Sequence, residues 1–339
     1  MLTLIFAPTL GTTDNLNGKE NVISDPELSE IIKAKQVLYE ATFPEIKFVV
    51  FTQAEAWIND INRLAAMLGF EPSNLDYEHP TALRQTLMEV SIERIILMTR
   101  RKMASATLFK ADKPLGSRRN ICVLTLNPTT LASTDAIATR HLLDISDFDF
   151  SKIPTLHYLD RHDYLRYVFD HEAFHCLDSF YSGPQPMSMD PYWGQYHNYR
   201  HELGADAYSV GVHIRVNNAI SSFVKNLFRL RTTSLYSGYI DHRTCDAIQE
   251  MTEIGVAKLS KLSFRELLET AITLRNKLAP DYQSYLRYRR AAAEAIRILN
   301  SADTSVIEDI PDVPIDKVLV KKLVEQASTC QDLLIDTNN

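Results

Sequence analysis

Two histidines and a glutamate lie close together in the middle of the chain, in the run His171-Glu172-Ala173-Phe174-His175. Residues four apart on a helix differ by about 40° around its axis, so both imidazoles would project from one face and share a metal ion. Glu172 would lie beside the open coordination position, where it can move a proton from a bound water to a leaving amine. A chance match to this HExxH spacing has odds of roughly 2 % in such a chain. The pattern predicts a hydrolytic metal centre; the alternative is two ordinary helix histidines.

A second group of candidate ligands follows twenty-seven residues after His175, where Glu202 and Asp206 are again four apart. A catalytic zinc site uses three protein ligands and one open position, and Glu202 would complete the set as His2Glu. Metal-bound histidine usually donates its second ring N–H to a carboxylate, a task that suits Asp206. Three small residues nearby would let this helix approach the first one closely: Gly204, Ala205 and Ala207.

The two motifs together, His171-Glu172-x-x-His175 and Glu202-x-x-Ala205-Asp206, resemble the zincin metallopeptidases of the gluzincin type. The resemblance covers residues 160–216. It implies that His171, His175 and Glu202 bind Zn²⁺. It also implies that Glu172 is the general base and that Asp206 accepts a hydrogen bond from His171.

Departures from related patterns prevent assignment to one family within this type. Metzincins need a glycine three residues and a histidine six residues past the motif, where this chain has Asp178 and Tyr181. The 26 residues between the motif and Glu202 exceed the spacing of the thermolysin-like group and fall short of most CAAX-type relatives. His197 and His201 remain rival third ligands.

A peptidase also needs a group that stabilises the developing oxyanion. We consider Tyr192, Tyr196 and Tyr199 as candidates for this role or for the substrate cleft, with packing as the alternative for each. Other candidates are the following residues: Trp193, His197, Arg200, Tyr236, Tyr239 and His242. The proline-rich loop at 182–196 is expected to form one wall of the cleft, and the strand at 121–126 is expected to take the substrate by β-augmentation.

The elements that must position these residues are two helices. The first is predicted over 161–181, capped by Asp160 or Asp163 and ended by Gly183-Pro184. Apolar residues at helical spacing are available to bury it. The second is predicted over 198–216.

The rest of the chain predicts a predominantly helical α+β fold, with a zincin-like core, a small mixed sheet and a helical C-terminal half. Strands are expected at 2–7, 46–51, 107–110 and 121–126. Helices are expected at 27–41, 53–68, 81–103, 219–232, 243–260, 264–279, 283–300 and 315–335, with a linker at 301–314. The expected units are an N-terminal α/β region (1–115), the catalytic core (116–216), a helical subdomain (217–300) and a linker with a last helix (301–339).

Composition excludes several classes of protein. Of the 339 residues, 45 % are hydrophobic, which is ample for a buried core and rules out wholesale disorder. No apolar run is long enough to span a bilayer. The net charge of −7 argues against a general nucleic-acid binder. Residues 211–300 hold 14 Lys/Arg against 8 Asp/Glu, which we interpret as a solvated helical face.

The compartment is predicted from the cysteines and the N-terminus. Four widely spaced cysteines without a CxxC pair favour free thiols in a reducing compartment. The first residues read as a strand rather than a signal peptide, so we expect a cytoplasmic protein, or one exported without such a peptide. The oligomeric state is not indicated.

The sequence is therefore compatible with three functions. The first is a zinc-dependent endopeptidase acting on a protein or peptide. The second is a catalytically inactive zincin-like binding protein, which the long helical C-terminal half favours. The third is a protease whose first 110 residues cover its own cleft.

Overall fold

The computed structural model describes residues 26–52, 104–110, 120–142, 158–183, 190, 192–237, 240–300 and 314–329. The described chain is predominantly helical with one small mixed sheet, which confirms the predicted fold class. The expected elements at 2–7, 53–68 and 81–103 lie outside the described residues, as does almost all of the expected linker at 301–314. None of the described helices is long and apolar enough to cross a membrane.

The sheet consists of β1 (Ile46–Phe51), β2 (Ser105–Phe109) and β3 (Asn120–Thr125) in the order β1-β3-β2. Strand β3 runs parallel to β1 and antiparallel to β2. The expectation that the strand at 121–126 binds substrate is therefore wrong, because β3 is central and its backbone groups are bonded on both sides. Among the described strands, the edges are β1 and β2.

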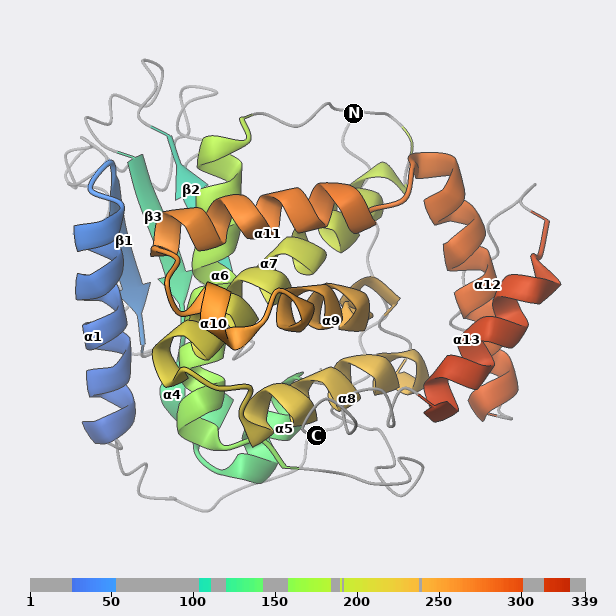
Figure 1. The fold of residues 1–339 in the computed structure, drawn as a ribbon, viewed down its shortest axis with the longest axis horizontal. Helices are drawn as coiled ribbons and strands as arrows, with labels where there is room; N and C mark the ends of the chain where they lie inside the picture. Colours follow the sequence, from blue (N-terminus) through green and yellow to red (C-terminus); the bar gives the residue numbers. More distant parts are fainter. Residues whose placement is uncertain are drawn as a thin grey trace, which may run out of the picture.

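One face of the sheet is covered by two helices, α1 (Pro26–Thr42) and α6 (Arg161–Tyr181) (Figure 1). Tyr39 of α1 packs its ring against Phe48 of β1 and Phe169 of α6, at centroid distances of 5.5 and 5.3 Å. Successive strand residues alternate between the faces. Phe48 and Leu124 accordingly join the main core, whereas Val49 and Val123 belong to a separate cluster.

Helix α6 matches its predicted range. The carboxylate of Asp160 caps it by accepting hydrogen bonds from the backbone N–H groups of His162 and Asp163 at 3.0 and 2.9 Å. The chain leaves the helix through Gly183, whose φ of 74° favours glycine. These local signals explain why both helix ends could be predicted.

Helix α7 (Trp193–Asn217) begins five residues before its predicted start. Asp190 nucleates the first turn, since its side chain accepts a hydrogen bond from the backbone N–H of Tyr192 at 2.9 Å. The aromatic residues Trp193 and Tyr196 then pack on Tyr282. Residues 193–196, the last part of the expected loop, are therefore helical, with Tyr196 buried and Trp193 half-buried by these contacts.

Two of the four cysteines are not free thiols, contrary to the prediction. Cys122 of β3 and Cys176 of α6 form a disulfide across 54 residues of sequence. This pairing follows from the packing of α6 on the sheet and carries no spacing signature. Cys245 is a buried thiol, and Cys330 lies outside the described residues.

The remaining helices wrap α7 and extend the molecule away from the sheet (Figure 1). Two short helices that the sequence did not indicate precede α6, and a φ of 87° at Gly255 divides the helix expected at 243–260. The other bounds are α4 (Pro128–Ala132), α5 (Asp135–Leu142), α8 (Ser222–Ser237), the 3-10 helix Ile240–His242, α9 (Cys245–Glu253), α10 (Val256–Leu259), α11 (Phe264–Leu278), α12 (Tyr282–Asn300) and α13 (Lys317–Thr329).

Candidate metal centre

The structure brings the three predicted metal ligands together where α6 and α7 pack. His171, His175 and Glu202 each offer one ligand atom, and these atoms all lie within 4.8 Å of one another. Nε2 of His171 is 3.0 Å from Oε2 of Glu202, and Nε2 of His175 is 3.5 Å from Oε1. Two ligand atoms on one tetrahedral zinc ion lie about 3.4 Å apart. The three side chains are therefore close enough to share a single ion.

The carboxylate of Glu202 supports this fit. Its Oε2 atom is buried and faces two ring nitrogens, Nε2 of His171 at 3.0 Å and Nε2 of His242 at 3.5 Å. A buried carboxylate is costly unless hydrogen bonds or positive charge compensate it, and imidazole nitrogens or a metal ion can do so here. The donor set of two imidazoles and one carboxylate is one that zinc accepts.

Asp206 lies behind His171, as the resemblance implied. Its Oδ1 atom accepts a hydrogen bond from His171 Nδ1 at 2.9 Å, and the residue is fully buried. This hydrogen bond occupies Nδ1 and leaves Nε2 facing Glu202. Asp206 thus orients the imidazole that would bind the metal.

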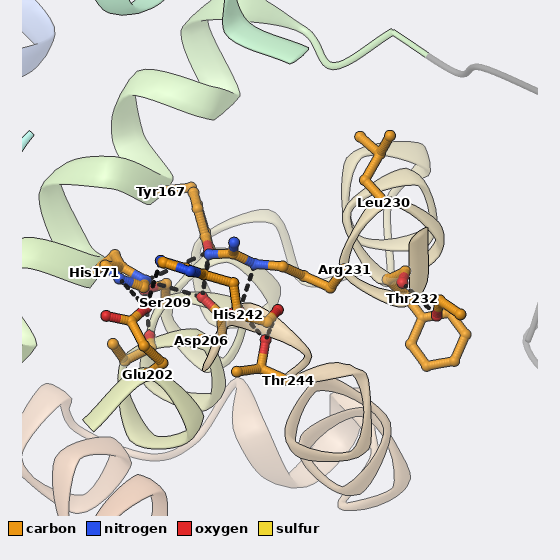
Figure 2. Close-up of polar contacts among 12 residues, drawn as sticks. Tyr167, His171, Glu202, Asp206, Ser209, Leu230, Arg231, Thr232, His242 and Thr244 are labelled. Carbon is orange, nitrogen blue, oxygen red and sulfur yellow. Dashed lines mark hydrogen bonds and ion pairs between the residues drawn. The ribbon is translucent and has the colours of Figure 1, made fainter. Parts of the chain in front are cut away.

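Three further residues converge on Asp206 (Figure 2). Arg231 of α8 donates to both carboxylate oxygens, from Nε at 2.7 Å and from Nη2 at 3.1 Å. The hydroxyls of Tyr167 and Thr244 donate to the same carboxylate. The pKa of Asp206 is held below its ordinary value because Arg231 and His171 outweigh the effect of burial.

Sequence reasoning missed Arg231, Tyr167 and Thr244. Tyr167 carries a usable signal, since it lies four residues before His171 and therefore on the same face of α6. Arg231 and Thr244 have no such signal in the sequence, because they lie 25 and 38 residues beyond Asp206. They reach it only through the packing of α8 and α9.

The predicted general base, Glu172, is buried beside the ligands. Burial raises the pKa of its carboxyl to about 7, against the opposing charge of His171. A carboxyl with this pKa can both accept and return a proton near neutral pH.

The two ligand histidines differ electrostatically. Burial lowers the pKa of His171, but the negative charges of Glu202 and Asp206 outweigh it and raise the pKa to about 10. Burial lowers the pKa of His175 to about 4, and Glu202 only partly opposes this. His175 is therefore neutral at physiological pH, the form in which imidazole binds metal, whereas His171 would release a proton when an ion binds.

A cavity of about 120 Å³ opens beside the predicted base. Its walls come from α5, α6, α8, the 3-10 helix and the residue before β2. The lining residues are Ala104, His141, Leu142, Tyr164, Tyr167, Val168, His171, Glu172, Arg231 and His242. A bound substrate would thus meet Glu172, Arg231 and His242 together.

His242 is the candidate oxyanion residue that the structure places at this cavity. Its Nε2 atom lies 3.5 Å from Glu202 Oε2, and the close-up shows its side chain among those of His171, Glu202 and Arg231 (Figure 2). The side chains of Tyr236 and Tyr239 lie outside the described residues.

The three tyrosines that were expected at the cleft lie elsewhere. Tyr196 donates its hydroxyl to the backbone carbonyl of Pro280 at 2.9 Å. Tyr199 is buried against the rings of two α12 tyrosines, and Tyr192 lies under the guanidinium of Arg289. None of the three lines the described cavity, because all three pack on residues of α12.

The rival ligands are also separate from the centre. Nδ1 of His201 lies 2.7 Å from Asp178, which is buried and also bound by Arg275. His197 packs against the ring of Trp193 at a centroid distance of 4.9 Å. Among the described residues, Glu202 is therefore the third ligand that the geometry selects.

Comparison of this chain with protein-family models, with curated proteins and with solved structures finds no match. The geometry of the centre carries the functional argument.

Proposed function

We propose that this protein is a zinc-dependent endopeptidase of the gluzincin type, acting on a protein or peptide substrate. The observation that carries the proposal is the convergence of His171, His175 and Glu202 on one point, with Glu172 at the adjoining cavity. The hydrogen bond from His171 to Asp206 is the further contact that the resemblance implied.

Glu172 is the residue that moves protons in this proposal. A zinc ion held by His171, His175 and Glu202 would lower the pKa of a bound water and polarise the scissile carbonyl. Glu172 takes the proton from the attacking water and returns it to the leaving amine nitrogen.

His242 and Arg231 are the groups that would meet the oxyanion. His242 lines the same cavity as Glu172, and Arg231 brings a positive charge to it. Donors fixed in a site from which water is excluded stabilise developing charge strongly. We assign the oxyanion contact to His242, since the guanidinium of Arg231 is engaged by Asp206 and Tyr167.

Substrate is proposed to bind along β2 rather than β3. Strand β2 is an edge among the described strands, it packs on α6, and Ala104 directly before it lines the cavity. Peptides commonly add to such an edge through main-chain hydrogen bonds.

The test is Glu172→Gln, which keeps the shape of the side chain and removes the base. We expect full zinc content by elemental analysis and a loss of hydrolysis of at least a thousandfold. Hydrolysis is measured on a library of quenched fluorescent peptides and by comparing the cleavage products of a whole proteome.

Two results would overturn the proposal. Wild-type rates in the Gln variant exclude Glu172 as the base. A wild-type protein that holds zinc but cleaves neither peptides nor proteome favours the catalytically inactive binding protein instead.

A further inference from the structure

The disulfide joins the helix that carries the metal ligands to the centre of the sheet. Cys176 directly follows His175 on α6. Cys122 is on β3, where it pairs with Phe48 of β1 on one side and Leu108 of β2 on the other. The covalent bond therefore reaches all three strands through one central residue.

The bond and the metal ligands lie on different faces of α6. Consecutive helix residues differ by about 100° around the axis. His175 is directed to Glu202 of α7, while Cys176 is directed to the sheet. A bond to β3 thus fixes both the rotation and the height of α6 relative to the sheet, and with them the direction of the two imidazoles.

The cavity depends on the same packing. Val168 and Glu172 of α6 form one part of its wall, and Ala104 before β2 forms another. Because β2 is bonded to β3 and β3 is bonded to α6, the disulfide connects these two parts of the wall.

Burial determines how the bond responds to reductants. Cys122 and Cys176 are 0 % and 1 % exposed. Thiol–disulfide exchange requires an attacking thiolate to reach one sulfur in line. An external reductant therefore reaches the bond only when α6 separates from the sheet.

We propose that the Cys122–Cys176 disulfide holds α6 on the sheet, and that the oxidised chain is the form in which α6 holds its metal ligands in register. Reduction by an external dithiol breaks the S–S bond and forms two S–H groups. The dithiol loses two electrons and two protons and becomes a disulfide. The reduced chain keeps its apolar packing but loses the cross-link, so α6 opens from the sheet more often.

The first test compares the double variant Cys122→Ala/Cys176→Ala with wild type. A cross-link over a loop of this length lowers the entropy of the unfolded chain, so we expect the Tm to fall by about 5–10 °C. We also expect backbone amides of α6 to exchange with deuterium at least tenfold faster, and zinc affinity in competition with a chromophoric chelator to fall roughly tenfold.

Cys245→Ala is the matched control. It also removes a buried sulfur, but from a thiol on α9. We expect it to leave exchange in α6 and zinc affinity unchanged, with only the small Tm loss of a cavity.

A second measurement uses the unaltered chain, in case the double variant does not fold. Wild type is treated with a water-soluble phosphine, which takes oxygen from water as it reduces the disulfide, and thiols are counted after denaturation. We expect slow reduction of the native protein, rapid reduction in denaturant, and a lower Tm with faster α6 exchange after native reduction.

Two outcomes overturn the proposal. One is an unchanged count of thiols after reduction in denaturant, which means that no disulfide forms. The other is wild-type Tm and α6 exchange in the double variant or the reduced protein. Neither readout uses peptide hydrolysis. A protein without peptidase activity would contradict the proposed function, whereas the role of the disulfide would still be decided by Tm and by deuterium exchange in α6.

Discussion

At the scale of residues, the centre depends on which ring nitrogen of His171 is hydrogen-bonded and which is left to bind a metal ion. The bond from Nδ1 to Asp206 leaves Nε2 beside Glu202. Arg231 keeps Asp206 charged, and an ionised acceptor strengthens the bond to the imidazole. The ligand set is thus selected by contacts behind it as well as by the motif.

Glu202→Ala tests the third ligand. Removing one of three protein ligands should weaken zinc binding by at least a hundredfold, because the remaining two imidazoles leave the ion half coordinated. The measurement is competition with a chromophoric chelator. His201→Ala is the control from the neighbouring position and should keep its zinc; full zinc occupancy in Glu202→Ala would return the third position to His197 or His201.

Asp178 gives a prediction on pH. Burial would raise the pKa of this carboxyl, but His201, Arg275 and Ser182 outweigh it and lower the pKa to about 2. A folded-state pKa below the unfolded value stabilises the fold above the unfolded pKa, and this contribution is lost as the pH falls toward the folded pKa. Between about pH 6 and 3, wild type should lose about 1 kcal/mol more stability than Asp178→Asn in urea unfolding. Equal losses of unfolding free energy in both proteins would show that Asp178 does not contribute to this pH dependence.

At the scale of elements, the centre requires α6 and α7 to cross closely. A Cβ on Gly204 would lie 2.4 Å from Cζ of Phe174, whose ring is itself buried against Tyr208. Gly204 is therefore the residue of α7 that permits the contact, in line with the expectation from its small size.

Gly204→Ala should force the two helices apart. We expect a loss of about 1–3 kcal/mol in urea unfolding, as in overpacked cores, and a measurable fall in zinc affinity. Gly194→Ala is the matched control, because it lies on the same helix with nothing within 4 Å of the new Cβ. It should be neutral or stabilise by up to about 1 kcal/mol. Similar effects of both substitutions would mean that the close crossing is not needed.

At the scale of the whole molecule, the site is built from residues that lie far apart in the sequence. The cavity takes residues from 104 to 242, and one hydrophobic cluster runs from Leu28 of α1 to Leu286 of α12. A ligand that ties α6 to α7 should therefore stabilise the whole fold rather than one helix pair.

Adding zinc at one hundred times its Kd should raise the free energy of unfolding by about 2.7 kcal/mol. In calorimetry this appears as an increase in Tm of about 5 °C, which a chelator reverses. Glu202→Ala should show no such shift. A wild-type Tm that does not respond to zinc would contradict a metal centre in this fold.

The features that the sequence predicted correctly depend on short-range interactions. The bounds of α6, the cap at Asp160 and the shared face of His171 and His175 depend on neighbours within one or two turns, and the sequence predicted them. The early start of α7, the central place of β3 and the pairing of Cys122 with Cys176 depend on partners far along the chain, and the predictions there were wrong.

The sequence by itself determined that the chain is largely helical and that two histidines and a glutamate share one helix. Helical periodicity and capping are local, so single residues encode them. Only the tertiary structure decided that Glu202 rather than His197 or His201 faces those histidines, and that Arg231 and His242 complete the surroundings. These contacts join helices separated by tens of residues, and the packing of apolar faces positions them. The spacing of Glu202 and Asp206 named one candidate ligand among three, but it could not show which of them meets the histidines.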